Sequence, residues 1–268
     1  MKFSIIIPNY NSEKWIKKLL DSICEQTYKD YEVIIVDDMS TDNSANIINE
    51  YIEKNELYEK FCLYHSQKKR WNGGTRNLGI KYAIGDYIIF ADCDDWFADE
   101  YCFERIARII DKDNPDLVRL PYSFVIGKYQ KAMMLKENTP QKLVNTIFVA
   151  PWTKCVKREL FVPFPENTLI EDVVQHIAQI DNIETISVCD KPIIIWNRSN
   201  PEAISATGHK YEVEDKRYSS IYRQLADLLD LRCKHDYCEA ERQKRIAFYF
   251  NIVHNAKEGT IVERGDKE

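Results

Sequence analysis

The chain has 268 residues, 44% of them hydrophobic, and a formal net charge of −6 at pH 7. This length permits one or two domains with a sizeable core, and the hydrophobic share excludes disorder over most of the chain. The mildly acidic charge gives no sign of a nucleic-acid-binding protein. No secretory signal is visible and no apolar run approaches the about 20 residues that cross a bilayer, so a cytoplasmic protein is expected.

The first 120 residues alternate between strand and helix patterns. Short apolar runs predict strands over 3–7, 32–36, 61–65, 86–91 and 116–120. Amphipathic spacing between them predicts helices over 15–23, 40–52, 73–83 and 99–110. This β-α-β-α order predicts an α/β fold with a mostly parallel sheet and helices on both faces.

The second half is less regular. Residues 121–160 are expected to form hairpins and loops, with turns near Gly127 and Pro140. A helix is predicted over 171–181 and a strand over 193–196, and the chain turns helical and charged from about residue 210. We therefore expect a nucleotide-binding half over 1–120, an acceptor-binding half of the same domain over 121–205, and a C-terminal helical tail over 206–268.

Polar residues follow three of the predicted strands directly. They are Asn9-Tyr10-Asn11, Asp37-Asp38 and Asp92-Cys93-Asp94. Because ligands bind at the carboxyl ends of the strands in open parallel sheets, these residues predict a ligand site on one edge of the sheet.

The triplet from Asp92 to Asp94 suggests a metal site. Two carboxylates two residues apart can share one hard divalent cation, which would bridge to a diphosphate. Asp95 adds a third negative charge, and crowded carboxylates repel one another unless a cation is present. The alternative is a solvated turn.

Two further segments carry polar groups with more than one interpretation. Asp37 and Asp38 can accept hydrogen bonds from a ribose or a base, or they can belong to the start of the helix near Ser40. The segment Asn72–Gly79 begins a helix with glycines and carries Arg76, which suits a phosphate or a base; the glycines can also be plain turn residues. The chain contains neither a GxGxxG nor a GxxxxGK[ST] motif.

Four segments, in this order and spacing, resemble glycosyltransferase family 2, a large family with the GT-A (Rossmann-like) fold. They are Phe3–Asn11, Val33–Asp42, Asn72–Gly79 and Gly85–Trp96. The resemblance implies an inverting, metal-dependent glycosyltransferase that takes its sugar from a nucleoside diphosphate sugar, most often a UDP-sugar. The helical pattern after about residue 210 adds a C-terminal helical extension to this expected domain.

The resemblance assigns roles to individual residues. Pro8 and Tyr10 would line the base pocket, Asp37 and Asp38 would bind the base or ribose, and Arg76 would contact the nucleotide. Asp92 would reach the ribose side and Asp94 would ligate Mn²⁺ or Mg²⁺, with Asp92 as the second metal acid. Met39 stands where such proteins usually have Gly.

In the second half, the segment from Thr168 to Val173 resembles the family's Glu-Asp segment, in which the Asp is the catalytic base. Asp172 would take this role, although acids in a first helical turn are also stabilised by the helix dipole. Trp152, Lys154 and Glu171 are expected to face the acceptor. The alternative for the first two is a core Trp and a Lys whose stem alone is buried.

The expected function is transfer of a sugar to a glycan or lipid-linked acceptor in surface polysaccharide synthesis, at the inner face of the membrane and without spanning it. The sequence does not decide whether the chain forms a homo-oligomer. The alternatives are a nucleotidyltransferase that makes a nucleotide-sugar, and a non-catalytic module that binds one. The first predicts a Gly-rich basic loop after the first strand, where this chain has Asn9–Ser12.

Overall fold

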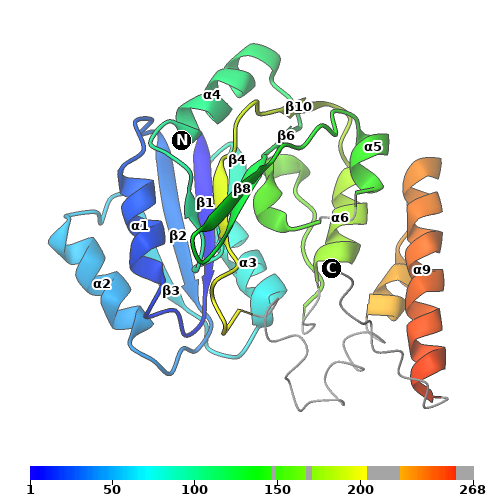
Figure 1. Cartoon of the computed structure of the whole chain (residues 1–268), viewed down its shortest axis with the longest axis horizontal. Helices are drawn as coiled ribbons and strands as arrows, with labels where there is room; N and C mark the ends of the chain where they lie inside the picture. The colour runs from blue at the N-terminus through cyan, green and yellow to red at the C-terminus, as the bar shows by residue number, and fades with distance from the viewer. Residues whose placement is uncertain (147–148, 167–170, 204–223, 258–268) are drawn as a thin grey trace.

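The computed structural model describes residues 1–146, 149–166, 171–203 and 224–257. A seven-stranded sheet in the order β10-β6-β9-β4-β1-β2-β3 forms its centre (Figure 1). Its strands are β1 (Phe3–Asn9), β2 (Tyr31–Asp37), β3 (Phe61–His65), β4 (Tyr87–Phe90), β6 (Leu117–Arg119), β9 (Lys154–Lys157) and β10 (Ile186–Val188). Every pairing is parallel except those of β9, which is antiparallel to both of its neighbours.

Helices pack on this sheet and beside it. They are α1 (Ile16–Cys24), α2 (Ser44–Lys54), α3 (Trp71–Tyr82), α4 (Cys102–Asp113), α5 (Pro140–Val144), α6 (Asp172–Ile180) and α9 (Asp236–Lys257). Residues 224–230 are helical too, and Pro151–Thr153 and Arg158–Leu160 form single 3-10 turns.

Successive side chains of a strand point to opposite faces of the sheet, and helices cover both of these faces. Tyr31 of β2 contacts Phe103 of α4 edge-on and donates a hydrogen bond to Ile23 O of α1 (3.0 Å). Ile6 of β1 points the other way, because a Cβ added at Gly79 of α3 would lie 2.5 Å from its Cγ2. The mostly parallel sheet covered on both faces, predicted from the sequence, is confirmed.

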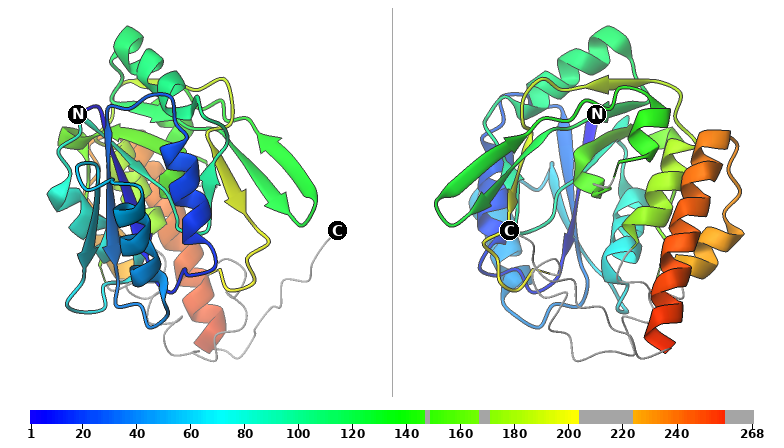
Figure 2. Two further views of the ribbon diagram at one scale, coloured as in Figure 1. Left: turned by 90° about the vertical axis from the view of Figure 1, so that its left-hand side faces the viewer. Right: turned by 45° about the vertical axis from the view of Figure 1, so that its right-hand side comes forward.

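A second sheet of four strands lies against the first in the order β5-β11-β7-β8. Its strands are β5 (Trp96–Phe97), β11 (Ile194–Asn197), β7 (Tyr122–Ile126) and β8 (Tyr129–Met133). The β7–β8 hairpin projects from the body of the molecule (Figure 2). Gly127 closes its turn with φ +57°, a conformation that glycine adopts without strain.

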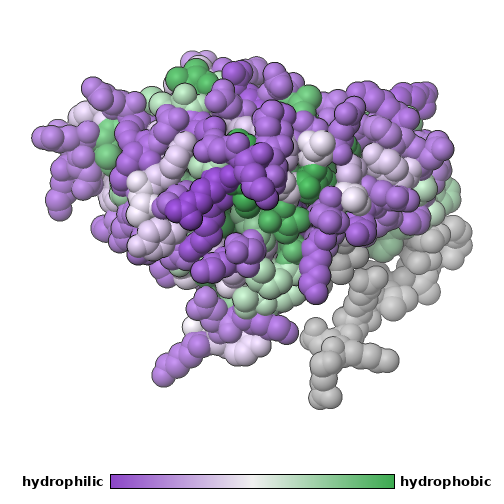
Figure 3. Space-filling view, turned by 90° about the horizontal axis from the view of Figure 1, so that it is seen from above, coloured by the Kyte–Doolittle hydropathy of each residue, from purple (hydrophilic) through white to green (hydrophobic). Residues whose placement is uncertain are grey.

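Two apolar cores hold these layers together. The larger lies between the main sheet and its helices. The smaller joins α5, α6, α9 and the helical residues 224–230 through residues such as Leu143, Ile177, Leu228 and Tyr249. The surface seen from above in Figure 3 is mostly hydrophilic, with apolar patches near its centre. No helix in the described part of the chain is long and apolar enough to cross a membrane.

Some element boundaries differ from the prediction. Strand β9 lies within 121–160, where only hairpins and loops were expected, and it pairs with β4 and β6 in the main sheet. Helix α2 starts at Ser44 instead of Ser40, and Asp42 Oδ1, just before the N-cap residue Asn43, accepts the backbone N–H of Ser44 (3.0 Å). The expected tail over 206–268 lies partly outside the described residues, but α9 is helical as predicted.

Candidate functional site

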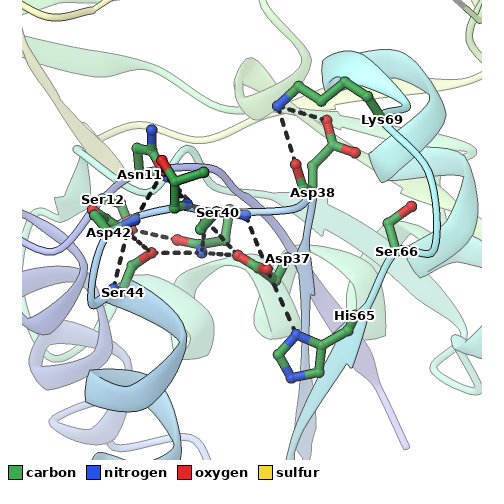
Figure 4. A network of polar contacts seen from close by, with 12 residues as sticks. Asn11, Ser12, Asp37, Asp38, Ser40, Asp42, Ser44, His65, Ser66 and Lys69 are labelled. Atoms are coloured by element: carbon green, nitrogen blue, oxygen red, sulfur yellow. Dashed lines mark hydrogen bonds and ion pairs between the residues drawn. The ribbon is translucent and has the colours of Figure 1, made fainter.

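The carboxyl ends of β1 and β2 meet in a polar network (Figure 4). Asp37 Oδ1 accepts hydrogen bonds from Asn9 Nδ2 (2.7 Å) and Ser40 Oγ (2.5 Å), and its Oδ2 lies 3.6 Å from His65 Nδ1. Met39, between Asp38 and Ser40, has φ +62°, the left-handed region that favours glycine. The turn therefore keeps the backbone shape that the family's usual Gly provides, at some cost in strain.

Asp38 points to the other side of this turn and holds the start of α3. Its carboxylate accepts the backbone N–H groups of Arg70 (2.7 Å) and Trp71 (3.0 Å), and Lys69 Nζ lies 3.2 Å away (Figure 4). The same ammonium sits 2.9 Å from the ring centroid of Tyr10, which is 47% exposed. Tyr10, Asp38 and Lys69 thus share one corner of the strand edge, next to the buried Pro8.

Arg76 lies at the centre of the acidic groups. Its guanidinium is 2% exposed, ion-pairs with Asp92 (2.8 Å) and with Glu171 at closer range, and lies 4.0 Å from Asp172. The positive charge of Arg76 is stabilised by these carboxylates, which raise its pKa against the effect of burial. Arg76 therefore joins the acidic strand end after β4 to the Glu-Asp segment at the start of α6.

The remaining acids after β4 are tied to the second sheet. Asp95 Oδ1 accepts the backbone N–H of Asn197 (2.8 Å), and Asp94 Oδ2 accepts a hydrogen bond from Asn200 Nδ2 (2.7 Å). Burial, followed by the charges of Asp94 and Asp92, raises the pKa of Asp95 well above its usual range. The crowding of carboxylates expected from the sequence is present in the structure.

The donor set suits a hard divalent cation. Asp92 and Asp94 offer carboxylate oxygens, the ligands that Mg²⁺ and Mn²⁺ prefer. Burial raises the pKa of Asp94, so its charged form gains from a cation beside it. No group of three His, Cys, Asp or Glu side chains within the described ranges can enclose a metal by itself.

Asp172 and Glu171 differ in their surroundings. Glu171 is 2% exposed and is held by Arg76, whereas the Asp172 side chain is 31% exposed at the first residue of α6. Burial raises the pKa of both carboxyl groups, and Arg76 partly offsets this for each. Asp172 is the more accessible carboxylate of the pair. Residues 168–170 of the predicted Glu-Asp segment lie outside the described residues.

The two other residues predicted to face the acceptor are buried. Trp152 is 3% exposed and packs edge-on against Tyr122. Lys154 is 3% exposed; its Nζ donates to Val149 O (2.8 Å) and lies 3.1 Å from Nδ1 of His176. The opposite ring nitrogen of His176 contacts Leu143 O (3.0 Å), so Nε2 carries the proton and Nδ1 accepts from Lys154. The whole side chain of Lys154 is therefore buried, including its terminal nitrogen, and not only its aliphatic stem.

Three site residues escaped the sequence reasoning. Lys69 lies in a basic run, from Lys68 to Arg70, that gave no hint of its position over Tyr10. Asn197 and Asn200 lie more than 100 positions from the acids that they contact. An Asn-Arg-Ser-Asn run directly after the predicted strand over 193–196 was the only available signal for the last two.

The sheet order and the acidic strand ends define a GT-A type fold, and comparison with protein families agrees. The model described as "Glycosyl transferase family 2" matches residues 4–159. The chain belongs to this family, and the resemblance predicted from its sequence is confirmed.

Several characterised proteins are similar to this chain. The poly(ribitol-phosphate) beta-N-acetylglucosaminyltransferase TarS of Staphylococcus aureus is 35% identical over 266 residues, covering 94% of this chain and 44% of TarS. A poly(ribitol-phosphate) beta-glucosyltransferase of Bacillus spizizenii is 37% identical over 142 residues, covering 52% of this chain and 22% of the relative. This chain thus spans less than half the length of these curated relatives.

Solved structures of glycosyltransferases are also similar to this chain. The crystal structure of S. aureus TarS 1–349 in complex with UDP-GlcNAc matches with a TM-score of 0.74 and 27% identity, covering 96% of this chain and 73% of that one. A mannosyltransferase from Pyrobaculum calidifontis, in complex with GDP-Man and Mn²⁺, has a TM-score of 0.63 at 16% identity and shows the shared fold.

Proposed function

We propose that this chain is the catalytic part of an inverting glycosyltransferase that moves a sugar from a UDP-sugar to a hydroxyl of a cell-surface glycan or lipid-linked acceptor. The observation that carries the proposal is the position of Arg76, which brings Asp92 and the Glu171-Asp172 pair around one buried guanidinium. Asp92, on the side proposed for the leaving diphosphate, and Asp172, the candidate base, therefore lie on the same edge of the sheet.

Asp172 is proposed as the general base. The acceptor oxygen forms a bond to the anomeric carbon, the bond from that carbon to the diphosphate breaks on the opposite face, and the hydroxyl proton passes to Asp172. A partly exposed carboxylate with a raised pKa is matched to this task, because it binds the proton more readily than an ordinary Asp. Mn²⁺ or Mg²⁺ held by Asp92 and Asp94 would neutralise the diphosphate.

The donor nucleotide is proposed to bind at the corner formed by Pro8, Tyr10, Asp37 and Asp38. The exposed ring of Tyr10 offers a face for a base, and the buried carboxylates offer acceptors for polar hydrogens. The TarS complex with UDP-GlcNAc supports a UDP-sugar as the donor.

The names of two relatives, both acting on poly(ribitol-phosphate), support a cell-surface polymer as the acceptor. Such an acceptor would place the protein at the inner face of the membrane.

Turnover of purified chain with UDP-GlcNAc, UDP-glucose and GDP-mannose tests the proposal, with release of nucleoside diphosphate as the measurement. Water replaces the unknown acceptor in this assay. We expect release from at least one UDP-sugar, dependent on Mn²⁺ or Mg²⁺, and none from GDP-mannose. Nucleotide binding without any release would favour the non-catalytic module, and formation of a nucleotide-sugar from UTP and a sugar phosphate would favour the nucleotidyltransferase.

A further inference from the structure

One face of the second sheet carries a row of aromatic side chains that runs from the core to the surface. Its inner end is Trp152, which contacts Tyr122 and Trp196 at ring-centroid distances of 5.2 and 6.1 Å. Its outer end is Phe124 and Tyr129, 6.0 Å apart, with Tyr129 56% exposed. We call Phe124, Tyr129 and Trp196 the aromatic platform.

Arg198 lies over this platform. Trp196 of β11 and Phe124 of β7 are register partners, and Arg198 N donates to Val125 O (2.9 Å), which continues the pairing past the end of β11. The Arg198 guanidinium is 5.0 Å from the ring centroid of Trp196 and 5.6 Å from that of Phe124. Arg198 is exposed, and its contact with the two rings restrains its guanidinium.

The charge on this surface is positive. Among the described residues, Arg198 has no carboxylate within ion-pair distance, unlike Arg76, Arg105 and Arg108, which all do. Lys131 is the register partner of Phe124 on β8 and is also exposed. A guanidinium held on two rings presents a planar set of N–H groups that matches a phosphate, which it can bind through two hydrogen bonds.

The platform is joined to the acids of the candidate site by its own strand. Asn197, immediately before Arg198, donates to Asp95, and Asn200, two residues after it, donates to Asp94. Arg198 therefore lies between two residues that are hydrogen-bonded to the acidic segment after β4, one of them to Asp94, a proposed metal ligand.

We propose that Arg198 and the aromatic platform bind the acceptor, and that the acceptor is a phosphate-bearing sugar or polyol chain. Tyr129, the exposed ring of the platform, takes the apolar face of a sugar or polyol unit, and Arg198 takes a phosphate beside it. This inference rests on the proposed glycosyl transfer. It also replaces Trp152 with the exposed residues Arg198 and Tyr129 as those that touch the acceptor, because Trp152 itself is buried.

Titration of the chain with an oligomer of ribitol phosphate tests this, with tryptophan fluorescence as the signal because Trp196 lies beneath the proposed phosphate site. We expect R198A to weaken the affinity roughly tenfold or more, and R198K to fall between R198A and the wild type, since an ammonium keeps the charge but loses the planar fork. R108A is the matched control, because Arg108 is 77% exposed on α4 and should leave the affinity unchanged. Free ribitol should bind far more weakly, and added salt should reduce the difference between wild type and R198A.

The failure of this inference is distinguishable from that of the proposed function. UDP affinity and UDP-sugar hydrolysis should be the same in R198A and the wild type. If the wild type hydrolyses a UDP-sugar but R198A binds the oligomer as tightly as the wild type, the acceptor site is elsewhere. The same conclusion follows if the wild type does not bind the oligomer, if inorganic phosphate alone binds as tightly, or if R198A loses only binding to phosphatidylglycerol vesicles. Absence of any UDP-sugar turnover overturns the proposed function instead.

Discussion

Arg76 is the residue on which the candidate site depends most directly. Its guanidinium is buried among Asp92, Glu171 and Asp172, and it offsets part of the repulsion between them. A buried ion pair is weak evidence for net stabilisation, but removal of one partner leaves uncompensated charge in the interior. The consequence of losing Arg76 is therefore predicted to be larger than that of losing any surface charge.

Replacement of Arg76 with Met keeps much of the side chain's length and removes its charge. We expect the free energy of unfolding to fall by about 3–5 kcal/mol, because Glu171 would be left buried without a partner. Urea denaturation followed by circular dichroism measures this. R108M, which breaks only an exposed pair with Glu104, is the matched control. A loss below about 1 kcal/mol in R76M would mean that the buried carboxyl groups are protonated in the native state.

Asp172→Asn tests the proposed base, because it keeps the size of the side chain and removes its basicity. Transfer should fall by roughly a hundredfold or more, while UDP affinity and folded fraction stay near wild type. Asp111→Asn is the control: Asp111 lies on α4 and contacts Lys2 (2.9 Å) at the start of β1, on the opposite edge of the sheet. If Asp172 only stabilises the start of α6 through its interaction with the helix dipole, the variant would instead lose about 1 kcal/mol of stability and keep its turnover.

The same residue predicts the acid side of the pH profile. Asp172 accepts a proton only when it is ionised, and its pKa is raised by burial. The rate should therefore begin to fall at a higher pH than an ordinary Asp would give, as acidification protonates the base. Turnover per folded molecule, measured as a function of pH, shows this limb. The limb should be missing from the residual activity of Asp172→Asn, and its persistence there would assign it to another group.

At the scale of elements, helix α3 and the segment before α6 pack at unusually close range. A Cβ added at Gly73 would lie 2.5 Å from the backbone oxygen of Pro165 and 3.1 Å from Glu171 Cβ. The glycine therefore serves close packing between two elements, in addition to any role at the start of the helix. It sets the distance between Arg76, on the same helix, and Glu171.

Gly73→Ala should accordingly lower the free energy of unfolding by about 1–3 kcal/mol despite the better helix propensity of Ala. Turnover should fall as well, because Glu171 and Asp172 would be displaced from Arg76. Gly74→Ala is the matched control in the same helix: its added Cβ would lie 3.0 Å from Arg70 Cβ and 3.5 Å from Glu166 Cδ, whereas at Gly73 it would lie 2.5 Å from a backbone oxygen, so its effect should be smaller. Equal losses in the two variants would contradict the packing argument.

At the scale of the whole molecule, ligand binding should appear as global stabilisation, because a ligand that binds only the native state shifts the folding equilibrium. UDP with Mn²⁺ should raise the melting temperature more than either alone, and more than GDP with Mn²⁺. Asp94→Ala should lose the metal-dependent part of this increase, while Asp111→Ala should keep it. An unchanged metal dependence in Asp94→Ala would place the cation elsewhere.

Local patterns were sufficient to predict much of this architecture. The order of strands and helices over the first 120 residues follows from hydrophobic period and capping residues, which act over a few positions. Parallel strands bring their carboxyl ends to one edge, so the convergence of Asn9, Asp37 and Asp92 also followed from that order. The family followed from four motifs in the same region.

The sequence by itself thus determined the fold family and the edge of the sheet that carries the site. Only the tertiary structure decided which charges meet. Arg76 and Glu171 are 95 positions apart, and strand β9 enters the main sheet from a region without a clear strand pattern. Lys154, on that strand, is buried beside His176 for the same reason. Hydrophobic period reports the burial of a single element, whereas such pairings depend on how distant elements pack, which no local pattern encodes.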